Sequence, residues 1–236
     1  MTLFFVTSSG TEIGKTFIST LLIEQFRARG RSVSAIKPVA SGVTNDTLEK
    51  SDTGLLLRAL GRPVSMAEAD RISPWRFAAP LSPDMAAARE GRSICFDDLI
   101  AFSRRNGLRS FDALVIEGVG GLMAPLGEAH TVLDWMIALS GEMDARFLLV
   151  VGSYLGSISH SLTAVATMRA QNLTPAAVIV SQSLEEPVEL KETVATLHRF
   201  LPEIPILSVP RTGTPLQCIP DLTAWEPLSL GLPRGP

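Results

Sequence analysis

The stretch TSSGTEIGKT, residues 7–16, decides the fold. It ends in GKT, as a phosphate-binding loop does, but Ser9 occupies the position at which the usual template has its first glycine. We expect Gly10, one residue later, to supply the backbone freedom that the turn needs. An apolar run precedes the stretch and an amphipathic helical pattern begins at Lys15, so that main-chain N–H groups and a helix N-terminus would face an anion. This context favours a nucleotide loop over a generic strand-to-helix turn with a solvated lysine.

Six short apolar runs alternate with longer amphipathic segments. Their unbroken hydrophobic character is typical of strands covered on both faces of a parallel sheet. The runs are LFFVT (3–7), SVSAIK (32–37), DALVIEG (112–118), RFLLVVG (146–152), AAVIVSQ (176–182) and IPILSVP (204–210). Helical patterns cover 15–29, 159–171 and 187–201; the first stops at Gly30 and the last carries Pro187 near its first turn. The alternation predicts an α/β fold with a doubly wound, mainly parallel sheet flanked by helices.

Bulk composition indicates one domain over residues 1–236, with an irregular Pro/Leu/Gly-rich segment from about 212 to 236. The chain is 46% hydrophobic and 19% charged, which predicts a well-filled core. A net charge of -3 and a pI near 5.7, without a run of Lys/Arg, argue against a nucleic-acid surface. The three histidines are scattered and the two cysteines are far apart, so neither a zinc cluster nor a disulfide framework is expected.

The sequence contains no signal for a membrane or for export. The apolar run at the N-terminus is too short for a signal peptide and has no basic residue before it. No apolar stretch reaches the roughly 20 residues needed to span a bilayer. We therefore expect a soluble, cytoplasmic protein with no membrane partner.

Unusual residues gather at the carboxyl ends of the predicted strands. Ligands of open α/β sheets bind beyond these ends. The segments concerned are 7–16, 37–42, 117–121, 152–159 and 181–182. Five strand ends thus point to a single site.

Two carboxylates and a hydroxyl are candidate magnesium ligands. Mg²⁺ at a triphosphate keeps several waters and takes only one or two carboxylates. Glu117 ends the LVIE run and is followed by three glycines within four residues, a pattern that packing explains poorly. Thr16 supplies the hydroxyl of the phosphate loop. Asp52, in KSDTG, is open between a metal ligand and an ordinary helix-capping segment.

The segment KPVASG, residues 37–42, is the most distinctive. Pro38 biases Lys37 to an extended conformation, so the lysine leaves the strand end in a fixed direction. A positive charge there suits a transferring phosphoryl group or a carbamate, although solvated lysines at strand ends are common. Ser41 followed by Gly42 is similar to an anion-binding turn. The stretch APLSPD (79–84), with two prolines, is expected to form a rigid loop beside a pocket.

Together these motifs resemble those of dethiobiotin synthetases. TSSGTEIGKT aligns without a gap with that family's loop, T-G-T-D-T-x-V-G-K-T, and departs from it at Ser8, Gly10 and Ile13. KPVASG matches the family motif in full. SDTGLL, VIEGVGG, LDWM (133–136) and LGSISH (155–160) are similar to further family segments, and the likeness runs from about residue 3 to 210. It implies a P-loop NTPase fold.

The resemblance implies an ATP-dependent ring closure in biotin synthesis. 7,8-Diaminononanoate takes up CO₂, supplied as CO₂ or bicarbonate, as a carbamate. ATP phosphorylates the carbamate, and the second amine then closes the cyclic urea. Lys15 and Lys37 are the implied catalytic residues, while Thr16, Asp52 and Glu117 would hold Mg²⁺ directly or through water. A homodimer with its site near the subunit interface is also implied.

The same resemblance assigns further contacts. The implied nucleotide-binding residues are Glu12, Ile13, Gly14, Lys15, Thr16, Phe17, Asp52, Glu117, Gly118, Val119, Gly120, Ser181, Gln182, Val209, Pro210 and Arg211. The implied substrate-binding residues are Thr11, Ser41, Pro80, Ser82, Gly156, Ser157, Ile158 and Ser159. Ser181-Gln182 replace the family's Asn-Asp pair, and Asp84 and Ser159 replace a histidine and an asparagine. Since a serine offers only a hydroxyl to a base, Ser181-Gln182 predict a relaxed base selectivity, whereas Asp84 and Ser159 lie where the family binds the diamine.

Three alternatives differ from this interpretation in the motifs or the length that they require. A partition-type ATPase switch of the same fold would carry an extra lysine early in the loop, where this chain has Ser8-Ser9-Gly10. The synthetase half of a cobyrinate-type amidotransferase would need a glutaminase domain, for which 236 residues are too few. A nucleotide-binding paralogue with another diamine substrate or no turnover stays open.

Overall fold

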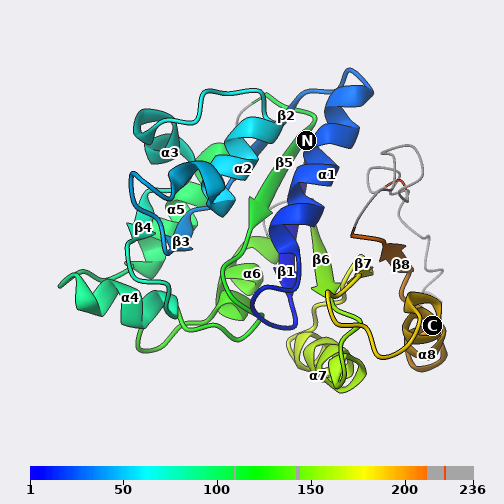
Figure 1. Cartoon of the computed structure of the whole chain (residues 1–236). Helices are drawn as coiled ribbons and strands as arrows, with labels where there is room; N and C mark the ends of the chain where they lie inside the picture. Colours follow the sequence, from blue (N-terminus) through cyan, green and yellow to red (C-terminus); the bar gives the residue numbers. More distant parts are fainter. Residues whose placement is uncertain (109, 142–143, 212–220, 222–236) are drawn as a thin grey trace, which may run out of the picture.

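The computed structural model describes residues 1–108, 110–141, 144–211 and 221. Its main sheet has six strands in the order β2-β5-β1-β6-β7-β8, and every neighbouring pair is parallel (Figure 1). The strands are β1 (Thr2–Ser8), β2 (Val33–Ile36), β5 (Ala113–Glu117), β6 (Ala145–Val151), β7 (Ala177–Ser181) and β8 (Ile206–Val209). The predicted parallel α/β sheet is confirmed, and each predicted strand agrees to within one or two residues at its ends.

The central part of the sheet is mostly apolar because both of its faces are covered. β1 lies between β5 and β6, with Phe5 in register with Ile116 on one side and Phe147 on the other. All five residues of β5 and of β7 are buried. This double burial explains why the strands appear in the sequence as unbroken hydrophobic runs.

Helices pack on the sheet in pairs. The first pair, α1 (Lys15–Ala28) and α2 (Asp52–Ala59), contacts β1, β2 and β5, and α1 crosses in front of the sheet in Figure 1. The second pair, α5 (Phe96–Gly107) and α6 (Val132–Ser140), contacts β5 and β6. A third pair, α7 (Ser157–Ala170) and α8 (Leu190–Phe200), lies toward the β8 edge. Among the residues described, no helix is both long and apolar enough to cross a membrane.

Two predicted helix starts were displaced. The first helix matches its prediction, and Gly30 at its end has a φ of +66°. Helix α7 begins at Ser157, two residues earlier than predicted, because Gly156 takes a left-handed conformation and caps it. Helix α8 begins only at Leu190, so Pro187 precedes the helix.

A second, small sheet was not predicted. It pairs β3 (Val39–Ser41) with β4 (Trp75–Phe77) in parallel. Strands of three residues leave too little periodicity to be recognised in a sequence. The 3₁₀ turn η1 (Leu48–Lys50) and helix α3 (Met66–Ile72) lie between these strands along the chain.

The stretch 79–84 is only partly the rigid loop expected. Helix α4 (Pro83–Arg89) begins inside it, with Pro83 in the first turn, where the missing N–H of proline costs nothing. The irregular segment predicted from about 212 lies outside the described residues apart from Asp221.

The LDWM segment belongs to the core. Trp135 of α6 is wholly buried and meets Phe5 of β1 edge to face, with ring centroids 4.8 Å apart. Its indole nitrogen donates to the Ser103 hydroxyl of α5 at 3.0 Å, which satisfies the only polar atom of the ring. Trp135 therefore joins β1, α5 and α6 and lies away from the strand ends.

Candidate active site

The phosphate loop leaves β1 and ends at the first turn of α1. Gly14 caps the helix with a φ of +111°, and Glu12 also has a positive φ of 59°. Within the described part of the chain, no main-chain N–H group from Gly10 to Phe17 donates to a protein acceptor. A row of free N–H groups at a helix N-terminus is a site for phosphate oxygens.

The expectation that Gly10 supplies the backbone freedom of the loop is wrong. The left-handed residues are Glu12 and Gly14, and Gly10 is not among the glycines with a positive φ. Close packing here depends on Gly121, since a Cβ atom on it would lie 3.0 Å from the Gly10 Cα atom. The loop and the segment after β5 are thus held against each other by their glycines.

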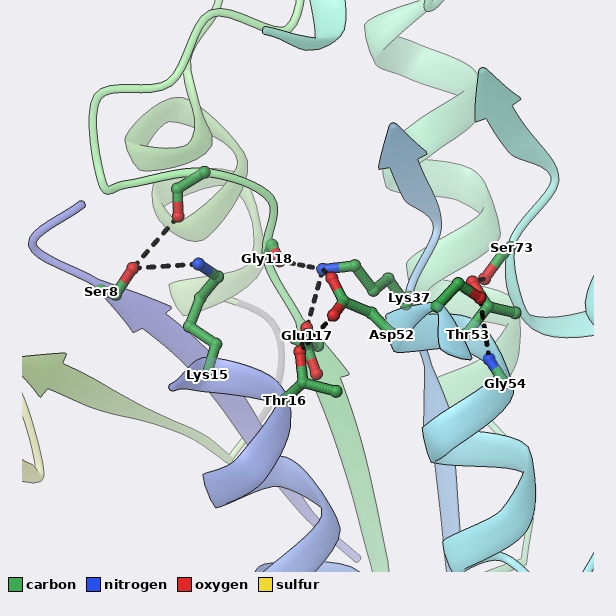
Figure 2. Close-up of polar contacts among 12 residues, drawn as sticks. Ser8, Lys15, Thr16, Lys37, Asp52, Thr53, Gly54, Ser73, Glu117 and Gly118 are labelled. Atoms are coloured by element: carbon green, nitrogen blue, oxygen red, sulfur yellow. Dashed lines mark hydrogen bonds and ion pairs between the residues drawn. The ribbon is translucent and has the colours of Figure 1, made fainter. Parts of the chain in front are cut away.

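Lys37 lies at the centre of a polar cluster beyond the ends of β2 and β5. Its Nζ atom is 2.7 Å from Glu117 Oε1, 2.9 Å from the Gly118 carbonyl oxygen and 3.1 Å from Asp52 Oδ2 (Figure 2). All three ammonium protons therefore have an acceptor. The lysine is 2% exposed, which contradicts the alternative of a solvated lysine at a strand end.

The cluster shifts the pKa values of its members. Burial alone would lower the pKa of Lys37, but the charges of Glu117 and Asp52 outweigh it and raise that pKa above its ordinary value. The positive charge of Lys37 is the largest cause that lowers the pKa of Asp52, and the Thr16 hydroxyl lowers it further. Lys37 therefore stays protonated and Asp52 ionised at neutral pH.

Thr16, Asp52 and Glu117 meet as one group of oxygen atoms. The Thr16 hydroxyl oxygen lies 2.7 Å from Asp52 Oδ1 and 2.8 Å from Glu117 Oε1. The second carboxylate oxygen of Glu117 is buried without a hydrogen-bond partner. A hydroxyl and two carboxylates, one of which has an unpaired buried oxygen, fit the hard oxygen ligands that Mg²⁺ prefers.

The local structure of α2 aims Asp52 at this group. Ser51 caps the helix by accepting from the Gly54 N–H, so Asp52 is the first helical residue and is free of the capping role. The wholly buried Thr53 shares a hydrogen bond of 2.9 Å with Ser73 at the end of α3. A Cβ atom on Gly54 would lie 2.0 Å from the Leu48 carbonyl oxygen, so only glycine allows η1 to pack there.

Lys15 begins α1 on the other side of the cluster. Its ammonium donates to the Ser8 hydroxyl at 3.1 Å and has no further hydrogen bond or ion pair within the described ranges. Burial is the largest cause that lowers the pKa of Lys15, to about 8; the charge of Lys37 acts in the same direction, while Glu117 and Asp52 partly oppose it. Two donors of Lys15 thus remain for an anion in the loop.

The ends of β7 and β8 bring the expected base-contacting residues together. Ser181 pairs with Val209, and the Gln182 N–H donates to the Val209 carbonyl oxygen at 3.0 Å. The Gln182 side chain accepts from the Arg211 N–H at 3.3 Å and donates to Glu186 at 2.7 Å. Ser181 is buried, and a Cβ atom on Gly14 would lie 2.6 Å from its hydroxyl oxygen. Ser181 therefore packs under the phosphate loop, while Gln182 ties two strand ends together.

The expected substrate contacts fall into two groups. Near Lys37, Ser41 ends β3 with its hydroxyl oxygen buried and unpaired, and a Cβ atom on Gly42 would lie 3.3 Å from Pro80. Ser82 precedes α4 and donates to Asp84 at 2.5 Å. The second group, residues 156–159, opens α7, and none of the described polar contacts joins it to the Lys37 cluster.

A groove of about 660 Å³ lies between the outer side of the phosphate loop and α7. Thr11 and Glu12 line it from the loop, and His160 and Thr163 line it from the helix. The Tyr154 hydroxyl and His160 Nδ1 lie 2.8 Å apart at its wall. The sequence patterns predicted no role for Tyr154, His160 or the Ser8 hydroxyl, because the turns that bring Tyr154 to His160 and Ser8 to Lys15 have no periodic signal.

This strand, loop and helix, with Lys15 and Thr16 at the helix start and an acidic residue at a neighbouring strand end, define a P-loop nucleotide-binding protein. The MinD cell division protein of Aquifex aeolicus shares this fold with a TM-score of 0.51 and 16% identity, over 90% of this chain and 83% of that one. A family model described as an AAA domain matches residues 2–214.

Sequence relatives define the family more narrowly. An ATP-dependent dethiobiotin synthetase of Acidiphilium cryptum is 47% identical over 206 residues, which cover 87% of this chain and 91% of the relative. One from Phenylobacterium zucineum is 46% identical and covers 90% of each chain. The chain belongs to the ATP-dependent dethiobiotin synthetase family. It is thus a member of an enzyme family whose name specifies ATP, which supports the main interpretation of the sequence over a partition-type switch.

Proposed function

We propose that this protein converts 7,8-diaminononanoate, CO₂ or bicarbonate, and ATP into dethiobiotin, ADP and phosphate. The observation that carries the proposal is the convergence of Lys15, Thr16, Lys37, Asp52 and Glu117 at one edge of the sheet beside a phosphate loop. Identities of 46–47% to named dethiobiotin synthetases support the same reaction. A cytoplasmic location fits a biosynthetic reaction that consumes ATP.

The chemistry would proceed in three steps. One amine of the substrate adds to CO₂ and loses a proton, which gives a carbamate. A carbamate oxygen attacks the γ-phosphorus of ATP and ADP leaves. The second amine then attacks the carbamoyl carbon and loses a proton. The bond from this carbon to the phosphate oxygen breaks, inorganic phosphate leaves, and the urea ring closes.

The charged residues would serve this sequence by position and electrostatics. Lys15 would contact the terminal phosphates through its two remaining donors. Lys37 would stabilise negative charge on the transferring phosphoryl group and the carbamate. Thr16, Asp52 and Glu117 would hold Mg²⁺, which neutralises phosphate charge during transfer. No protein nucleophile is needed, so the exposed Cys95 has no part in the reaction.

The decisive experiment measures product formation and ATP consumption together. Purified protein is supplied with 7,8-diaminononanoate, bicarbonate and MgATP, and dethiobiotin is detected by mass spectrometry. We expect one ADP for each dethiobiotin, and no product when EDTA replaces Mg²⁺. ATP binding without dethiobiotin would favour the alternative of a paralogue with another diamine substrate or no turnover.

We further propose a homodimer in which residues 156–159 of one protomer reach the substrate of the other. Three exposed apolar side chains beside the groove and the start of α7 support a partner surface there. Met123 and Leu184 line the groove, and Leu155 lies just before α7. Light scattering at micromolar concentration should report about twice 25.3 kDa. A monomer with full turnover would contradict the shared site.

A further inference from the structure

We infer that Ser8 is a positioning residue, whose hydroxyl holds the Lys15 ammonium at the floor of the phosphate loop. The inference rests on the proposed function in one respect, namely that Lys15 contacts nucleotide phosphates. It concerns a position at which this chain departs from the glycine of the family's loop motif.

Ser8 lies where three segments meet. It is the last residue of β1 and is 0% exposed. Its carbonyl oxygen accepts from the Leu122 N–H at 2.8 Å, which ties it to the segment after β5. Its hydroxyl oxygen lies 2.5 Å from the Gly10 carbonyl oxygen and 3.1 Å from that of Gly120. A side chain held from three directions has little rotational freedom left.

The hydroxyl can serve Lys15 because its single proton is already directed elsewhere. A hydroxyl donates one hydrogen bond and accepts up to two. The Ser8 hydroxyl donates its proton to a main-chain carbonyl oxygen, and the Gly10 carbonyl oxygen is the nearer of the two. The lone pairs of the hydroxyl oxygen are then available to the Lys15 ammonium, 3.1 Å away (Figure 2). The contact therefore has one direction, from Lys15 to Ser8.

The two lysines of the site are held in different ways. Lys37 gives its three donors to Glu117, Gly118 and Asp52, whereas Lys15 gives one donor to Ser8. A neutral hydroxyl orients the Lys15 ammonium without neutralising its charge. A long side chain with several rotatable bonds loses entropy when it is ordered on a ligand, and this contact would reduce that loss.

The test is a double-mutant cycle read by calorimetric binding of MgATP without diamine, so that no turnover is needed. We expect Ser8→Ala to raise the Kd for MgATP about tenfold. In a Lys15→Ala background, the same Ser8→Ala change should alter the Kd less than twofold, because the group that Ser8 positions is gone. Binding of AMP, which lacks the β- and γ-phosphates that Lys15 would contact, should be unchanged by Ser8→Ala.

Two further variants separate positioning from packing. Ser8→Cys keeps the shape of the side chain with a larger atom that is a much weaker hydrogen-bonding group, so it should bind MgATP as poorly as Ser8→Ala and serves if the alanine variant does not fold. Ser19→Ala is the control. Ser19 lies on α1, and its hydroxyl is also wholly buried but has no hydrogen-bond partner in the described part of the chain, so this change should leave the Kd unchanged.

Several results would overturn the inference. A wild-type Kd in both Ser8 variants would show that the hydroxyl has no role in binding. A tenfold loss that persists in the Lys15→Ala background would assign Ser8 to the loop backbone alone. If the wild-type chain itself does not bind MgATP, the proposed function fails and this inference fails with it.

Discussion

Lys37 and Glu117 form an ion pair, 2.7 Å between Nζ and Oε1, in which both side chains are almost entirely buried. The sheet itself creates this pair. Ile36 of β2 is in register with Ile116 of β5, so the next residue on each strand leaves the sheet beside the other. Two segments 80 residues apart in the chain thereby deliver opposite charges to one point.

Lys37→Ala should abolish most of the dethiobiotin synthesis. Loss of one preorganised charge costs about 3 kcal/mol of transition-state stabilisation, or roughly a hundredfold in kcat. Lys191→Ala, at a lysine that is 78% exposed, is the matched control and should retain full activity. A folded Lys37→Ala variant with activity within threefold of the wild type would remove Lys37 from the site. Circular dichroism checks the fold, because Glu117 is left buried without its cation.

Activity should decline as the pH rises past about 8. The pKa of Lys15 is lowered to about 8, chiefly by burial, so its ammonium loses its proton there, whereas the raised pKa of Lys37 keeps that residue charged. The profile of kcat/KM for ATP reports the free enzyme and should fall above this pH. Lys15→Arg remains charged and should lose this limb, at a lower overall rate. If kcat/KM of the arginine variant still declined above the same pH, the decline would belong to another group.

Stability should respond to the same group in the opposite sense. The pKa of Lys15 is about 8 in the folded chain and 10.5 in its ordinary, unfolded environment. Between these values the unfolded chain binds more protons, so the free energy of unfolding gains a contribution that rises with pH from about 8 to 10.5. Urea unfolding of the wild type and of Lys15→Ala at several pH values measures this contribution, since the variant lacks the titrating group.

Gly54→Ala should destabilise the protein and impair the site. The new Cβ atom would lie 2.0 Å from the Leu48 carbonyl oxygen, and η1 would have to move away from α2. Overpacking of this kind costs about 2 kcal/mol or more. Because Asp52 is in the first turn of α2, the Mg²⁺ concentration for half-maximal activity should also rise. Gly127→Ala, where a Cβ atom meets nothing within 4 Å, is the control and should match the wild type in urea unfolding.

Base selectivity should be relaxed. Ser181 is buried under the phosphate loop, and both ends of the Gln182 amide already bind Glu186 and Arg211, so neither side chain presents a free pair of groups to a base. A site rejects the wrong base mainly through its own polar groups left unpaired. We expect at least one of CTP, GTP or UTP within about tenfold of ATP in kcat/KM, a difference of ~1.4 kcal/mol. A preference for ATP above a hundredfold would show that main-chain groups, such as those near Val209, read the base.

The sequence by itself determined the sheet and the phosphate loop. Strands buried on both faces must be apolar throughout, and a loop that leads from such a strand into a helix at Lys15 has few other uses. The sequence also predicted site residues in the motif 37–42 and at Glu117. Charged groups at the ends of apolar strands are costly to bury without a partner, so their presence there indicates a function. These signals are local, so one stretch of chain is enough to carry them.

Only the tertiary structure decided how the site is held together. Whether Asp52 capped a helix or faced the cluster depended on Ser51, on Gly54 and on the packing of Leu48, which lies on another element. The Ser8 hydroxyl, the small β3–β4 sheet and the bridge from Gln182 to Arg211 each join segments that are distant in sequence or too short to show a period. Hydrogen bonds of this kind depend on the three-dimensional distance between two groups of the chain, and a pattern along the sequence contains no such distance.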